Sequence, residues 1–336
     1  MKRWVFTAIS FAAVIGVSIY AVRSGAPDSV RLSIPLRAHL LAFLAFAVEV
    51  CARSLKLTWS AKAVKTRLPF ITAVRTGLGG DFGASITPAR AGAEPARFLI
   101  LAEAGMPASE AMVILYAELF FEAISLFVVT AGIAVIFKAT SKAFLAMIGV
   151  VGLYAGFVIG LGVVGVVLAN RKPTDDPPRW ARLFRLNRKK RWDIVQRWLE
   201  RIRTTVAAFK QMHLGWGSLS LLASITHIAV RFTVLPLIVF SMTTASVPLA
   251  PLVIWPLGII YGAGVVPAPG GGGAVELAFR AALGNAIPRN LFAASLMWWR
   301  FYTFYIYIAL GALVAGNTAL RAVREAHDAE EEFENA

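Results

Sequence analysis

The stretch VVPAPGGGGAVE, from Val265 to Glu276, sets prolines and four consecutive glycines between two strongly apolar segments. Proline removes a helical hydrogen bond and glycine lowers helix stability, so this stretch should interrupt a helix. Backbone that is not helical survives at membrane depth only where it is buried in protein or lines a watery cavity. If its apolar flanks cross a membrane, the stretch marks a broken helix inside a folded membrane domain.

The composition is that of a membrane protein. Of 336 residues, 58% are hydrophobic, the mean hydropathy is +0.67, and several apolar runs reach the roughly 18 residues that indicate a span. We predict one all-α polytopic membrane domain over residues 1–336, with about seven to nine transmembrane helices. The seven clear predicted spans are Trp4–Val22 (interpreted as an uncleaved anchor), His39–Leu57, Ala108–Phe137, Ala143–Ala169, Trp216–Phe240, Val247–Val266 and Leu291–Ala315.

Two further segments are mixed in character. Cationic and apolar residues alternate over Thr58–Arg75, which predicts an interfacial amphipathic helix. Gly77–Met106 carries too many glycines and charges for an ordinary span and is too apolar for a solvated loop. It therefore predicts a second broken, re-entrant helix region.

The formal charge of +15 is unevenly distributed. From Arg171 to Lys210, 13 lysines and arginines face 4 acidic residues, which gives +9, whereas the tail 317–336 is acidic. The positive-inside rule explains the basic loop 170–213 more simply than nucleic-acid binding does. We expect this loop to be cytoplasmic, on the inner (cytoplasmic) membrane, with an amphipathic helix on the inner leaflet that also binds anionic lipid headgroups.

The two broken regions resemble each other at a constant spacing. Glu94 and Glu276, Pro107 and Pro288, and Glu118 and Arg300 are separated by 182, 181 and 182 residues. We interpret this as an internal repeat with halves at about 35–169 and 214–316. Repeats with broken helices in corresponding places are typical of transporters, whose site lies between the repeats.

The glycines also supply chemistry. Bare N–H groups at a helix start bind anions, and Gly270–Gly273 precede the predicted helix Ala274–Leu283. A phosphate would suit that place, although the glycines could equally serve close helix packing or a hinge.

At this point the sequence resembles a known family. TPARAGAEPARFLILAEAG followed by AELFFEAISL, and PAPGGGGAVE followed by WWRFYTFYIYIALGAL, resemble the flippase-like membrane domain of lysylphosphatidylglycerol synthases. Leu119 stands where that family usually has arginine, and Glu122 where aspartate is common, which puts the charge pairing of this span in doubt. The residues that match the family pattern are Pro88, Arg90, Gly92, Glu94, Arg97, Glu118, Pro269, Gly270, Gly271, Gly273, Glu276 and Arg300.

The resemblance implies movement of charged or polyprenyl-linked lipids between leaflets. We expect a stand-alone member without the aminoacyl-transferase domain of the synthases. The sequence has no nucleophile elbow, no His-Glu-x-x-His, no nucleotide loop and no metal-ligand spacing around Cys51 or the histidines, so we expect neither enzymatic activity nor a cofactor.

Charged residues inside spans are functional candidates because their insertion is costly. Glu118 and Arg300 could lock the halves as an ion pair or exchange partners with a lipid phosphate. Arg90 and Arg97, if on one helix, share a face with Glu94 between them, and His227 and Arg231 share another. The predicted substrate-binding residues are Arg90, Glu94, Arg97, Glu118, Arg231, Gly270, Gly271, Gly272, Gly273, Glu276 and Arg300; Glu49, Asp81, Glu103 and Glu122 are weaker candidates, as proton carriers.

Two functions fit the sequence. The first is a flippase that moves an anionic lipid, its phosphate on the glycine N–H groups and on Arg90, Arg97 and Arg300. The alternative is a scaffold that presents lipid to a partner synthase and docks through the basic loop. The expected partners are membrane lipids and a lipid- or glycan-pathway protein, without nucleic acid; the oligomeric state stays open.

Overall fold

The computed structural model describes residues 32–87, 90–138, 141–170, 189–262, 271, 273–318 and 321, and over these residues every regular element is helical. The predicted span Trp4–Val22, Gly270, Gly272 and most of the acidic tail lie outside the described residues.

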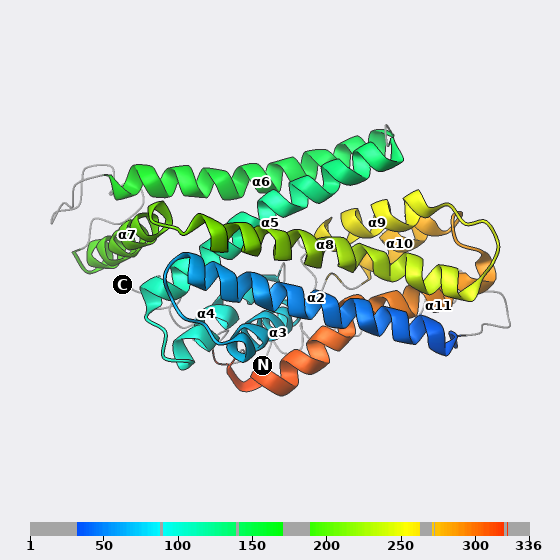
Figure 1. Cartoon of the computed structure of the whole chain (residues 1–336), viewed down its shortest axis with the longest axis horizontal. Coiled ribbons are helices and arrows are strands. Elements are labelled where there is room, and N and C mark those ends of the chain that lie inside the picture. Colours follow the sequence, from blue (N-terminus) through cyan, green and yellow to red (C-terminus); the bar gives the residue numbers. More distant parts are fainter. Residues whose placement is uncertain are drawn as a thin grey trace.

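Long helices run along the long axis of the molecule (Figure 1). They are α2 (Leu36–Ala63), α5 (Ala108–Phe137), α6 (Lys142–Ala169), α8 (Leu214–Met242) and a continuous helical run from α11 (Arg289–Arg300) through the π-helical turn η5 (Phe301–Tyr305) to Thr318. Four of these, Ala108–Phe137, Phe144–Ala169, Leu214–Met242 and Arg289–Thr318, are long and apolar enough to cross a membrane. The chain is thus a multi-pass membrane protein, as predicted.

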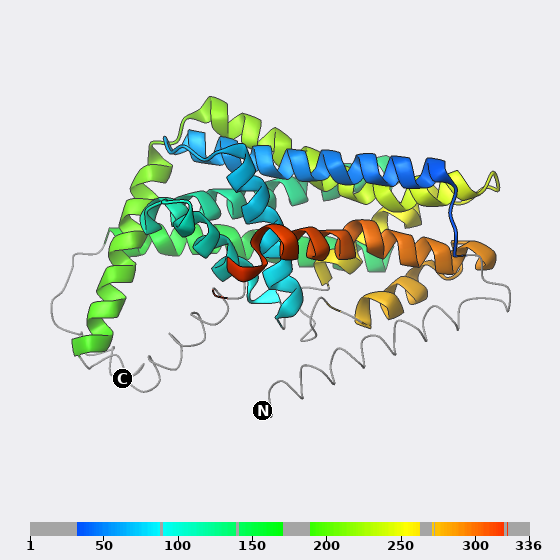
Figure 2. The same ribbon diagram turned by 90° about the horizontal axis from the view of Figure 1, so that it is seen from below.

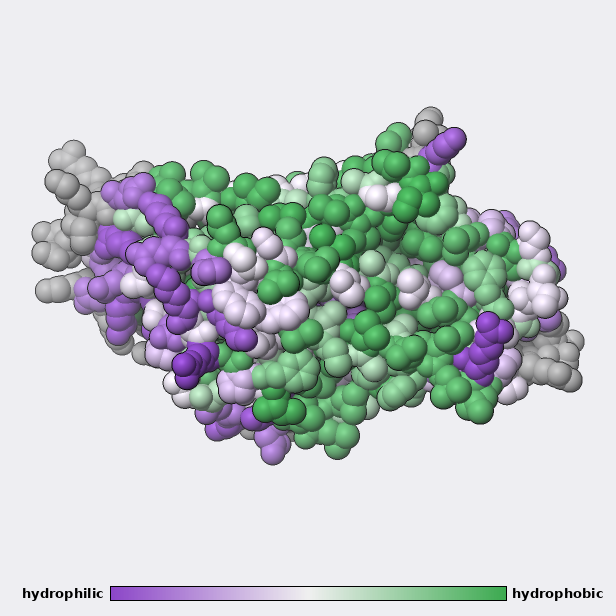
Figure 3. Space-filling view, viewed as in Figure 1, coloured by the Kyte–Doolittle hydropathy of each residue, from purple (hydrophilic) through white to green (hydrophobic). Residues whose placement is uncertain are grey.

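The surface also indicates that the molecule lies in a membrane, with its long axis across the bilayer. Hydrophobic residues cover the middle of the molecule, and hydrophilic residues gather towards the two ends of the long axis (Figure 3). Large apolar side chains such as Phe43, Leu153 and Phe157 are exposed on long helices. In water such a surface would be an aggregation hazard, whereas in a bilayer it faces acyl chains.

The predicted interfacial helix over Thr58–Arg75 is wrong. Helix α2 continues to Ala63, and the chain then turns, with Lys65 at φ 64°, before α3 (Phe70–Ile86) begins after Pro69. Ser60 and Ala61 are buried, because this end of α2 packs inside the protein instead of lying on a membrane surface.

The predicted span Val247–Val266 lies only partly within the described residues. Its described part is helix α9, Leu249–Gly262, which is 14 residues, and residues 263–266 lie outside the part of the chain that the structure describes.

The first broken region consists of α3 and α4 (Ala93–Glu103), with the break at 87–92. Two glycines allow these helices to approach closely. A Cβ atom at Gly83 would lie 2.5 Å from the backbone oxygen of Gly92, and one at Gly92 would lie 2.7 Å from that of Gly83. The glycine content that sets Gly77–Met106 apart therefore serves packing within the helix pair.

This close approach gives a stability prediction. We expect Gly83→Leu to lower the unfolding temperature by roughly 2–12 °C, because overpacking costs about 1–3 kcal/mol. Gly132→Leu is the matched control, since a Cβ atom there meets nothing within 4 Å. Thermal melts in detergent compare the two; equal melting temperatures would contradict the close packing.

The second broken region joins α9 to α10 (Ala274–Leu283), which begins after the glycine stretch. Gly271 has φ 65° and Gly273 has φ 78°, a left-handed conformation that residues with a Cβ atom rarely adopt. At these two positions the turn itself requires glycine.

The predicted amphipathic helix is present as α7 (Lys189–Lys210), which crosses one end of the bundle (Figure 2). Part of its apolar face covers protein instead of lipid. The Phe209 ring packs against Tyr116 and Phe120 of α5, and Ile202 and Val206 lie over Gly165 of α6.

Candidate functional site: a buried arginine and carboxylate network

The centre of the bundle holds charged side chains that the long helices bury. Helix α2 supplies Glu49, Arg53 and Lys56, whose spacing of four and three residues places them on one helix face. All three are buried, and Lys56 is completely so. Since isolated buried charges are costly, each must have a partner from another element.

Lys56 and Arg97 form ion pairs with three carboxylates of α4 and α5. The ammonium group of Lys56 lies 3.1 Å from Glu118 and 2.9 Å from Glu122, both on α5. The guanidinium of Arg97 lies 3.1 Å from Glu94, the predicted neighbour, and 3.4 Å from Glu118. Lys56 thus supplies from α2 a cation for Glu118 of α5.

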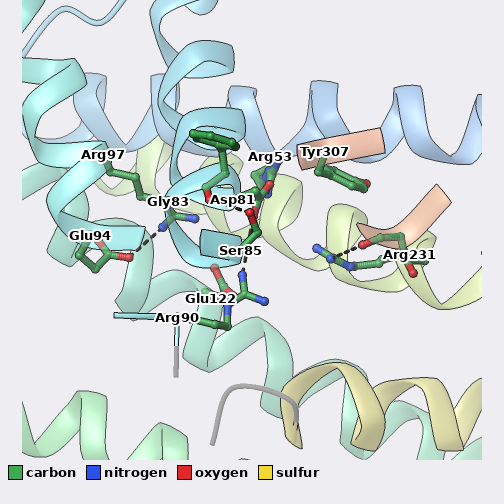
Figure 4. Close-up of polar contacts among 12 residues, drawn as sticks. Arg53, Asp81, Gly83, Ser85, Arg90, Glu94, Arg97, Glu122, Arg231 and Tyr307 are labelled. Carbon is green, nitrogen blue, oxygen red and sulfur yellow. Dashed lines mark hydrogen bonds and ion pairs between the residues drawn. The ribbon is translucent and has the colours of Figure 1, made fainter. Parts of the chain in front are cut away.

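The next group centres on Asp81 of α3 (Figure 4). Arg53 donates a hydrogen bond of 2.6 Å to one oxygen of Asp81, and Arg90 lies 3.7 Å from the other. Arg90 occupies the break between α3 and α4, with φ 60°. The expectation that Arg90 and Arg97 share a face of one helix is therefore wrong, and Arg90 joins Asp81 instead.

Glu49 connects α2 to the second half of the chain. It accepts a 2.6 Å hydrogen bond from the Tyr307 hydroxyl and lies 3.6 Å from both Arg231 and His227 of α8. Arg231 also donates to the backbone oxygen of Thr303 in η5, at 3.0 Å. His227 and Arg231 therefore both face Glu49; their spacing predicted the shared helix face but not this partner.

The second broken region ends in a buried ion pair. Arg300 lies 2.9 Å from Glu276, whose other oxygen accepts a 2.8 Å hydrogen bond from the Gly273 N–H group. Two expectations change as a result. Glu118 and Arg300 each pair with other residues, and the Gly273 N–H group binds a carboxylate of the chain itself, which would repel a phosphate at that helix start.

Two small adjoining cavities lie inside this network. Arg90, Arg231, Thr303 and Phe304 line both of them; Asp81 borders one, and Arg300 borders the other. Each has about 20 Å³ of space, room for about one water molecule. Three arginines therefore converge on the second cavity, and in this conformation neither cavity has room for a ligand much larger than water.

The charges are not balanced locally. Around the cavities Arg53, Arg90 and Arg231 face the carboxylates Glu49 and Asp81, so three cations meet two anions, a surplus of +1 if His227 is neutral. The neighbouring cluster has two cations, Lys56 and Arg97, and three carboxylates, a surplus of −1. The cavity side of the network is therefore the side that favours an anion.

Comparison with known families identifies the family of the chain. The family model described as the lysylphosphatidylglycerol synthase TM region matches residues 5–311. The chain belongs to this family. Among curated proteins no relative matches the chain. Membership confirms the resemblance of the sequence motifs and gives the chain a role connected with membrane lipids.

The structure brings together only part of the predicted site of this lysylphosphatidylglycerol synthase TM-region protein. Arg90, Arg231 and Arg300 line the cavities, whereas Glu94, Arg97 and Glu118 form the neighbouring cluster. Sequence reasoning missed Arg53, Lys56 and Tyr307. Arg53 and Lys56 could have been found from the sequence, because their spacing places them on the same helix face as Glu49. Tyr307 could not be distinguished from the other aromatic residues of the last span.

Proposed function

We propose that this protein moves an anionic, phosphate-bearing lipid or polyprenyl-linked lipid between the leaflets of the cytoplasmic membrane. One observation carries the proposal: Arg90 from the first broken region, Arg231 from α8 and Arg300 from α11, the helix after the second broken region, line one and the same cavity. The three arginines come from both halves of the chain, so a phosphate in this cavity would contact both halves at once.

Arginine suits this task. Its guanidinium offers a planar fork of donors that matches a phosphate, and it stays charged at any physiological pH. Each of the three already has a carboxylate nearby: Asp81 for Arg90, Glu49 for Arg231 and Glu276 for Arg300. These carboxylates keep the arginines paired when no lipid is bound, and a phosphate that enters would compete with them for the guanidinium groups.

The arrangement of the halves supports alternating access. The broken pair α3 and α4 and the pair α9 and α10 occupy opposite halves of the long axis, and α5 and Arg289–Thr318 run in opposite directions (Figure 1). This is the pattern that an inverted repeat would produce, with the site between its halves. Because the cavities are small here, transport requires the halves to rock apart, while the lipid tails stay in the bilayer.

The alternative, a scaffold for a partner synthase, is favoured by α7. Its residue Trp198 is 51% exposed at the end of the bundle, and the Arg201 guanidinium lies over the Trp198 ring. An exposed tryptophan next to arginine is a common anchor at protein interfaces.

Lipid scrambling in proteoliposomes tests the proposal. We expect the protein to move fluorescent phosphatidylglycerol faster than phosphatidylcholine, and Arg231→Gln to slow this by about tenfold or more, the effect of losing one charge-assisted hydrogen bond. Arg289→Gln, at an exposed arginine outside the network, should be neutral. Unchanged movement in Arg231→Gln would overturn the arginine site; function in cells that survives Arg231→Gln but not Trp198→Ala would favour the scaffold.

A further inference from the structure

A larger cavity lies away from the charged network, between α2, α8 and α9. Its volume is about 440 Å³ and its lining is mostly apolar. Ala229, Thr233 and Pro236 of α8, spaced by four and three residues, form a floor of small side chains. The larger side chains Phe240 and Leu249 stand beside it. The small side chains therefore leave space on this face of α8, and the larger side chains form the walls of the resulting groove.

The groove has one charged end. Arg37 lines it from the first turn of α2 and is exposed, and no ion pair or hydrogen bond joins its side chain to another described residue. Helix α2 begins at Leu36, α8 ends at Met242 and α9 begins at Leu249, so three helix ends meet there. In a bilayer such ends reach the headgroup level, and the apolar groove extends from it towards the hydrocarbon.

We propose that this groove binds one phospholipid, with its phosphate on Arg37 and an acyl chain along the floor formed by Ala229, Thr233 and Pro236. The charge pattern selects this occupant. A cation at headgroup level followed by an apolar channel complements an anionic headgroup followed by its chain. The lining is mostly apolar, and on a membrane-facing surface the apolar molecules at hand are lipid chains.

This site is separate from the proposed translocation cavity. Arg231 lies two residues from both Ala229 and Thr233, about 200° around the helix from each, so the two sites occupy opposite sides of α8. Lipid binding in the groove consequently does not require the arginine site to transport, and either proposal can fail alone.

Photolabelling of the full chain in vesicles tests the groove. The probe is a phosphatidylglycerol with a diazirine in one acyl chain, and the readout is label on peptides of α8 and α9 by mass spectrometry. We expect Arg37→Gln to reduce this label about fivefold, the effect of one arginine near an anionic lipid surface. Ala229→Trp and Thr233→Trp, at exposed positions, should reduce it by filling the groove.

Matched controls make the result specific. Arg289→Gln removes an exposed arginine elsewhere, and Leu222→Trp enlarges an exposed side chain of α8 outside the groove; both should leave the label unchanged. A diacylglycerol with the same photoreactive chain should label more weakly. Equal label in Arg37→Gln and wild type, equal label from diacylglycerol, or a second copy of the chain cross-linked on this face in place of lipid would each overturn the proposal.

Discussion

Replacing Lys56 by methionine is expected to destabilise the folded protein by about 3–5 kcal/mol, a fall of roughly 6–20 °C in unfolding temperature. Lys56 is completely buried and lies within 3.1 Å of both Glu118 and Glu122. Methionine fills a similar volume but leaves two neighbouring carboxylates with one cation, Arg97, between them. The measurement is the fraction of monodisperse protein that remains after heating in detergent.

Two variants show whether lost charge compensation is the cause. Lys62→Met, also on α2, removes an exposed lysine whose ammonium lies 4.4 Å from the Trp216 ring, and should cost about 0.5–1 kcal/mol. The double variant Lys56→Met with Glu122→Gln should recover much of the stability, because Arg97 still compensates Glu118. If Lys56→Met melts like Lys62→Met, the ion pairs of Lys56 contribute little.

The helical architecture could be predicted because it follows from local signals. Apolar length located α5, α6 and α8, and the glycine and proline content of Gly77–Met106 located the break between α3 and α4. The prediction for Thr58–Arg75 failed because alternation of charge and apolarity does not distinguish a membrane surface from a protein interior. Ser60, for instance, hydrogen-bonds Ser220 of α8, a partner 160 residues away that no local pattern contains.

The candidate site was less predictable for the same reason. Individual charges in spans were visible, but their partners depend on which helices pack together. Glu118 and Arg300 occupy equivalent places in the sequence and seemed a natural pair, yet Glu118 pairs with Lys56 of α2 and Arg300 with Glu276. The glycine stretch was expected to present N–H groups to a phosphate, whereas Glu276 already accepts from Gly273. Repeat spacing identifies corresponding positions, and tertiary packing decides contacts.

Substitution of Arg300 by glutamine should reduce movement of phosphatidylglycerol about 100-fold, more than Arg231→Gln does. Removing one partner of a buried, hydrogen-bonded charge pair costs about 2–5 kcal/mol, and Glu276 is only 2% exposed. Arg300→Gln therefore both removes a cation from the cavity and uncovers an anion beside it. The uncovered Glu276 would repel the phosphate that Arg300 attracts, whereas Glu49, near Arg231, keeps Tyr307 and Arg53 as partners.

A double-mutant cycle separates these contributions. Glu276→Gln keeps an oxygen that can accept from the Gly273 N–H group and leaves Arg300 free to bind an anion, so it should bind phosphatidylglycerol more tightly. The double variant Arg300→Gln with Glu276→Gln should move lipid faster than Arg300→Gln alone, because no uncovered carboxylate remains. Scrambling rates and melting temperatures of all four proteins are needed. Additive losses, with no gain in the double variant, would mean that Glu276 does not face the moving headgroup and that the pair only holds α10 against α11.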